Sequence, residues 1–184
     1  MTTVFLGGSR AISQLNPVIR EQLDNLIARQ CKVLIGDANG ADKAMQKHFA
    51  DKQYRQVVVF CMTHPRNNLG NWETRAITSE RKTSDSEYYA TKDRVMGREA
   101  RCGLMLWDGT SKGTLGNILE LANDRKTALV YFAPEKKFFK LTSDIELEAL
   151  LSRCDQSQLT NLNTTQPLAA PPCEIRVAER HGLG

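Results

Sequence analysis

The sequence of 184 residues contains no long hydrophobic run. A helix that spans a membrane needs roughly 18 or more consecutive apolar residues, and no stretch of this chain approaches that length. The N-terminus begins almost at once with the strand-like run Val4-Phe5-Leu6 and lacks the basic and apolar segments of a secretory signal. We therefore expect a soluble, cytoplasmic protein without a membrane partner.

Cysteine and histidine are too scattered for a disulfide framework or a metal centre. The five cysteines are odd in number and form no Cys-x-x-Cys pair, and the three histidines lack metal-ligand spacing. His48 falls beside Met45 and Phe49 on the apolar side of an expected helix, which favours a packing role. The sequence thus predicts reduced thiols, no metal site and no certain cofactor.

Charge of one sign is not concentrated anywhere in the chain. The formal net charge is +4, and basic residues alternate with acidic ones along most of the sequence. Nucleic acid is therefore not the favoured partner. With 41% hydrophobic residues the chain can bury one core. We expect one domain over residues 1–151 and a flexible tail over 152–184, where glutamine, asparagine, threonine and proline become frequent.

Short apolar runs alternate with amphipathic runs, which is typical of α/β proteins. Strands are expected at residues 4–6, 32–35, 57–61, 103–106 and 128–132, and helices at 17–30, 41–49, 88–101, 115–122 and 144–151. Such units connect with a right-handed crossover. The sequence therefore predicts a Rossmann-like, doubly wound, mainly parallel five-stranded sheet with helices on both faces.

Three glycine-bearing turns each follow a strand-like run. Glycine lets the backbone turn sharply and approach a ligand, and the helix after the third turn presents unpaired N–H groups to anions. Because the carboxyl ends of parallel strands open on one edge, the three turns can converge on one crevice, where a nucleotide phosphate fits. The first turn is Gly7-Gly8-Ser9-Arg10. The second runs from Gly36 to Asp42, and its other candidate binding residues are Asp37, Asn39 and Gly40. The third runs from Asp108 to Thr114, and its other candidates are Gly109, Ser111, Lys112 and Gly113.

The segment 63–87 breaks the alternation of strands and helices. It shows little periodicity and many charges, so we expect a long loop or lid, or a surface excursion that Trp72 pins to the core. In the helix that follows, Met96 is expected toward the core and Lys92 elsewhere. The candidates in the loop for facing a ligand are Arg66, Asn67, Asn68, Trp72 and Arg75.

The three turns together resemble those of the SLOG superfamily of Rossmann-like proteins, over most of residues 1–132. This superfamily includes the DNA-processing DprA/Smf proteins, the YspA/YpsA-like proteins and the LOG phosphoribohydrolases. Segments 36–43 and 107–114 resemble the second turn and the main phosphate loop of the YspA-like branch. The resemblance implies a nucleotide-binding domain and a homodimer or higher homo-oligomer. It is less specific for activity, because the superfamily mixes enzymes with binding proteins.

The LOG enzymes use a glutamate in a Gly-Gly-x-Gly-Thr-x-x-Glu pattern, with an upstream arginine, to cleave an N-glycosidic bond. Here Asn117 stands at the position of the glutamate, and Lys92 lies nearest the position of the arginine, with Arg94 close by. An amide hydrogen-bonds a ribose hydroxyl but cannot act as a carboxylate base. Glu120, about one helical turn further, replaces that glutamate only if its side chain reaches the crevice.

The leading hypothesis is a sensor or carrier that binds a nucleotide or nucleotide-derived small molecule. Cations neutralise phosphate, hydroxyls hydrogen-bond it, and carboxylates accept from ribose hydroxyls. The expected cations are Arg10 and Lys112, the hydroxyls Ser9, Ser111 and Thr114, and the carboxylates Asp37, Asp42 and Asp108.

Two alternatives stay open at this point. One is a nucleotide N-glycosidase, with Glu120, Glu99 or Asp108 as the catalytic carboxylate. The other is single-stranded DNA binding as in DprA, with Trp72 stacking on a base. The basic groups for that role are Arg66, Arg75, Arg81 and Lys82.

Overall fold

The computed structural model describes residues 1–78 and 86–154. Its centre is a seven-stranded sheet with the order β4-β3-β2-β1-β5-β6-β7. Neighbouring strands are parallel except at β6 and β7, which are antiparallel. The strands are β1 (Thr3–Gly8), β2 (Lys32–Gly36), β3 (Val57–Cys61), β4 (Glu73–Ala76), β5 (Cys102–Trp107), β6 (Ala128–Phe132) and β7 (Lys137–Leu141).

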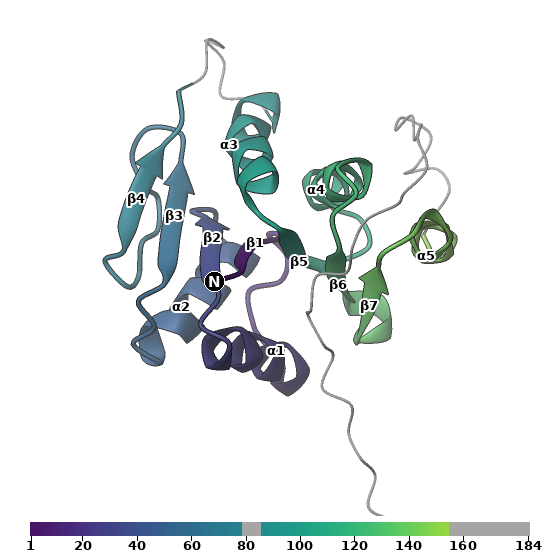
Figure 1. Ribbon diagram of the computed structural model, residues 1–184, viewed down its shortest axis with the longest axis horizontal. Coiled ribbons are helices and arrows are strands. Elements are labelled where there is room, and N and C mark those ends of the chain that lie inside the picture. The colour runs from purple at the N-terminus through teal and green to yellow at the C-terminus, as the bar shows by residue number, and fades with distance from the viewer. Residues whose placement is uncertain (79–85, 155–184) are drawn as a thin grey trace, which may run out of the picture.

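Helices cover both faces of the sheet (Figure 1). One face carries α1 (Pro17–Ala28) and α2 (Ala41–Asp51), and the other carries α3 (Ser86–Glu99), α4 (Lys112–Asn123) and α5 (Asp144–Leu151). A 3-10 turn, η1 (Ala133–Glu135), joins β6 to β7. None of the helices within the described ranges is long and apolar enough to cross a bilayer.

Alternating side chains of the central strands supply the two halves of the core. In β1, Val4 and Leu6 pack in the half beneath α1 and α2, whereas Phe5 packs in the half beneath α3 and α4. Both faces of these strands are covered, which explains why they read as continuous apolar runs rather than alternating ones. The predicted mostly parallel α/β sheet with helices on both faces is therefore confirmed.

The predicted count of five strands is wrong, because the sheet has an additional strand at each edge. β4 lies inside the segment that was expected to be a loop, and all four of its residues are exposed. β7 follows the 3-10 turn and places lysines at both ends of the pair Phe138 and Phe139. Edge strands bury less surface and tolerate charge, so neither carries a clear apolar signal.

The loop after β3 is fastened to the sheet. The buried Gln46 side chain donates to the carbonyl oxygens of Gly36 and Asn67 and accepts from the N–H of Leu69. Trp72 is 8% exposed, and its Nε1–H donates to the carbonyl of Tyr54 at 2.7 Å. Trp72 thus anchors this loop to the core, as one of the two interpretations expected. The rest of the predicted lid over 79–85 and most of the predicted tail, 155–184, lie outside the described residues.

Candidate functional site

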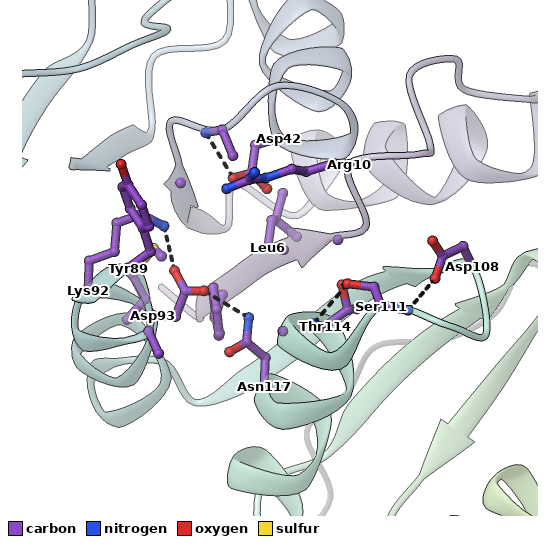
Figure 2. A pocket seen from close by; sticks show the side chains of 18 of the residues that line it. Leu6, Arg10, Asp42, Tyr89, Lys92, Asp93, Asp108, Ser111, Thr114 and Asn117 are labelled. Atoms are coloured by element: carbon purple, nitrogen blue, oxygen red, sulfur yellow. Dashed lines mark hydrogen bonds and ion pairs between the residues drawn. The ribbon is translucent and has the colours of Figure 1, made fainter. Parts of the chain in front are cut away.

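A cavity of about 520 Å³ opens at the carboxyl ends of β1, β2 and β5. The chain leaves β1 toward β2 on one side, whereas β5 lies on the other side of β1. Such a switch point leaves a crevice beyond the strand ends, which is where ligands bind in open α/β sheets. The first turns of α4 and the inner surface of α3 form the walls of this crevice (Figure 2).

The three glycine turns do converge at this edge. The Oγ of Ser9 lies 3.2 Å from the Oγ1 of Thr114 and accepts from the N–H of Asp108 at 3.1 Å, which joins the first turn to the third. The carbonyl of Ser9 accepts from the N–H of Ala41 at 3.3 Å, which joins the first turn to the second. Gly40 permits this contact: its φ is +84°, and a Cβ there would collide with the carbonyl group of Arg10.

The amino end of α4 presents unpaired backbone N–H groups at the cavity. Ser111 caps the helix by accepting from the N–H of Thr114, and Asp108 Oδ1 accepts from the N–H groups of Thr110 and Ser111 at 2.9 and 2.7 Å. Burial alone would raise the pKa of Asp108, but these N–H donors outweigh it and lower the pKa. Asp108 is therefore an ionised anchor of its own loop. At Gly113, a cavity-lining residue, the backbone N–H has no acceptor within the helix.

The opposite wall of the cavity holds buried charges. Lys92 of α3 is 4% exposed, and its Nζ lies 2.5 Å from Asp93 Oδ1. Asp93 Oδ2 accepts from Asn117 Nδ2 of α4 at 3.2 Å. Burial would lower the pKa of Lys92, but Asp93 and Asp42 outweigh it and raise the pKa, so the ammonium is charged. The prediction that Lys92 points away from the core is wrong, because these carboxylates compensate its burial.

Gly36 makes room for two of these charges at the end of β2. A Cβ at this position would lie 3.0 Å from Lys92 Nζ and would collide with Asp42 Oδ2. Asp42, in the first turn of α2, is 6% exposed and accepts from the N–H of Ala38 at 3.3 Å. A side chain at residue 36 would therefore displace the carboxyl or the ammonium from the cavity.

Arg66, in the loop after β3, also lines the cavity. Its Nε and one terminal nitrogen donate to the two carboxylate oxygens of Asp37 at 3.0 and 2.7 Å, and its backbone N–H donates as well. Burial would raise the pKa of Asp37, but Arg66 outweighs it and lowers the pKa. The guanidinium carbon of Arg66 also lies 4.8 Å from the ring centroid of Tyr89. Asp37 is thus engaged in positioning Arg66.

The structure brings most of the predicted binding residues to this one cavity. Those that line it are Gly7, Gly8, Arg10, Gly36, Asp42, Lys92, Asp108, Ser111, Gly113, Thr114 and Asn117. The predicted residues outside its lining are Ser9, Asp37, Asn39, Gly40, Gly109 and Lys112. Among these, Ser9 and Gly40 support the turns, and Asn39 Oδ1 accepts from Asn67.

Among the cavity-lining residues of α3, sequence reasoning named only Lys92 as a binding residue. Tyr89, Asp93 and Met96 line the cavity with Lys92. These positions recur at helical spacing on one face, which was the available signal. Asp93 was overlooked because a charged residue inside a helix normally faces solvent.

The other candidate carboxylates lie elsewhere. Glu120 Oε1 accepts from Arg94 Nε at 3.1 Å, and Glu99 accepts from Arg75 at 2.6 Å, and neither glutamate lines the cavity. Burial raises the pKa of Glu120, against the opposing effect of Arg94. Of the groups suggested for single-stranded DNA, Arg81 and Lys82 lie outside the described residues, and Trp72 is buried.

Comparison with known proteins adds no assignment. No protein-family model matches the chain, and the search of curated proteins gives no match. Across residues 1–78 and 86–154, no group of three or more histidine, cysteine or acidic side chains is arranged to hold a metal ion.

Proposed function

We propose that this protein binds a nucleotide or nucleotide-derived ligand in the cavity at the switch point of the sheet. The proposal rests mainly on the position of the amino end of α4: Gly113, in the first turn of this helix, lines the cavity of about 520 Å³. Helix amino ends attract phosphate through unpaired N–H groups and the helix dipole. The volume is within the usual range of small-molecule pockets.

The distribution of polar groups supports one orientation of the ligand. A phosphate at the amino end of α4 is within the part of the cavity lined by Ser111 and Thr114, and the cation Arg10 lines the same cavity. Asn117 and Asp93, further along the cavity, suit ribose hydroxyls. A base then packs near the ring of Tyr89, which also lines the cavity. In this arrangement the protein acts as a sensor or carrier.

Cleavage of an N-glycosidic bond is the second candidate function. The observation that favours it is the Asp93 carboxylate, which lines the cavity beside Asn117, the residue at the position of the LOG glutamate. A carboxylate close to the anomeric carbon stabilises the positive charge that develops there. The two candidates differ in whether the ligand stays intact.

A matched pair of glycine substitutions tests the proposed site. A Cβ at Gly113 or at Gly116 of α4 meets nothing within 4 Å, but only Gly113 lines the cavity. Gly113→Leu fills the space in front of the helix amino end, whereas Gly116→Leu makes the same change in helix propensity away from it. Both variants should fold.

The measurement is thermal shift with nucleoside mono-, di- and triphosphates, NAD and ADP-ribose, with chromatography of the same samples for released base. We expect at least one of these ligands to stabilise the parent protein and Gly116→Leu, and not Gly113→Leu. Equal stabilisation of both variants would place the ligand elsewhere. Released base that disappears in Asp93→Asn would favour the glycosidase.

A further inference from the structure

One cluster of charges beside the cavity holds more carboxyl groups than cations. Three aspartates, Asp37, Asp42 and Asp93, surround the two cations Lys92 and Arg66. Arg66 is engaged by both oxygens of Asp37, and the Nζ of Lys92 contacts Asp93. Asp42 is thus the carboxyl group that remains without a cation of its own, at a position where burial makes a charge costly.

The geometry around Asp42 directs the carboxyl toward the ligand space. One oxygen accepts from the N–H of Ala38 at 3.3 Å, and the side chain lines the cavity while the residue is 6% exposed (Figure 2). Within the described part of the chain, no cation lies within ion-pair distance of it. The charged and titratable groups that share the cavity with Asp42 are Lys92, Asp93 and Tyr89 of α3, Arg66 of the loop after β3, Arg10 after β1 and Asp108 after β5.

We propose that Asp42 carries a proton and donates it in a hydrogen bond to an acceptor atom of the bound nucleotide, so that binding above neutral pH takes up one proton. This inference rests on the proposed function. Nucleotides offer acceptors in phosphate, ribose and base oxygens, and an ionised carboxylate in the same place would repel them. The protonated carboxyl supplies a donor without adding charge.

The electrostatics of the cluster agree with this geometry. Burial raises the pKa of Asp42 to about 7, with Asp93 and Asp37 adding to the shift and Lys92 and the Ala38 N–H opposing it. Asp37 and Asp108, whose pKa values are lowered, stay ionised at neutral pH. Asp42 therefore differs from Asp37 and Asp108.

Calorimetric titration of the full chain with AMP tests the inference. The second ionisation of a phosphate ester has a pKa of about 6, so the comparison uses about pH 7.5 and about pH 8.5, where the phosphate is a dianion at both. We expect AMP to bind about tenfold more weakly at the higher pH. Titration in two buffers of different ionisation enthalpy should report uptake of about one proton near pH 8.

Two variants identify the group. Asp42→Asn keeps a hydrogen-bond donor of similar shape that does not titrate, so its AMP affinity should be independent of pH and accompanied by no proton uptake. Asp51→Asn makes the same change at an exposed position of the same helix, α2, and should behave as the parent protein. Circular dichroism confirms that both variants fold.

The outcomes separate this inference from the proposed function. Binding of AMP that is independent of pH in the parent protein, or that keeps its pH dependence in Asp42→Asn, overturns the role of Asp42 and leaves the proposed function intact. No binding of any nucleoside mono-, di- or triphosphate, NAD or ADP-ribose between about pH 6 and about pH 9 overturns both.

Discussion

Asp42 also contributes to the pH dependence of the protein's stability when no ligand is present. Its pKa is raised from 3.8 to about 7 by burial, so the folded protein keeps this proton over a range in which the unfolded chain has lost it. The stability that this group contributes is fully present below about pH 4 and is lost as the pH rises toward about 7. A difference of about three pKa units corresponds to about 4 kcal/mol.

Urea unfolding of the parent protein and of Asp42→Asn, followed by circular dichroism between about pH 4.5 and about pH 8, measures this contribution. We expect the free energy of unfolding of the variant, relative to the parent, to increase by about 1.4 kcal/mol per pH unit up to about pH 7 and then to level off. Other acids titrate in both proteins, so their effects largely cancel in the difference.

A difference that stays constant over this range would refute the reasoning, because it would mean that Asp42 ionises in the folded protein as it does in the unfolded chain. Asp51→Asn makes the same change on the exposed part of the same helix and serves as the control for the substitution itself. This experiment examines the buried carboxyl without reference to nucleotide binding.

Three further substitutions test the surrounding structure. Gly40→Ala should destabilise the protein by about 1–3 kcal/mol in urea unfolding, because the φ of +84° and the contact with Arg10 disfavour a side chain. Gly97→Ala, on α3, should instead stabilise the protein by up to about 1 kcal/mol, because a Cβ at this position meets open space. Glu120→Gln should leave AMP affinity unchanged in calorimetry, because Glu120 does not line the cavity, and a large loss of affinity would contradict this placement.

The sequence could predict the strand ends and the turns because both depend on local chemistry. The central strands are covered on both faces and therefore form continuous apolar runs, and glycines mark where the chain turns at their ends. Parallel strands open on one edge, which is enough to expect the turns around Ser9, Ala41 and Thr114 to meet. The hydrogen bonds among these turns bear out that expectation.

Polar edge strands gave no comparable signal. Glu73–Ala76 has no apolar face and is a strand only because it pairs with β3. No pattern within these four residues predicts that pairing. The same limit applies to α3: its spacing identifies a helix but does not say which charged residues turn inward.

The sequence by itself determined a mostly parallel α/β sheet and the glycine-bearing turns at its edge, because these follow from periodicity and glycine placement along short segments. Only the tertiary structure decided which charged groups meet on the side of the cavity that faces the amino end of α4. There Lys92 and Asp93 come from α3, Asn117 from α4 and Asp42 from α2. A buried charge is tolerated only when its partners arrive from other elements, and that matching of charges across the fold is absent from any single stretch of sequence.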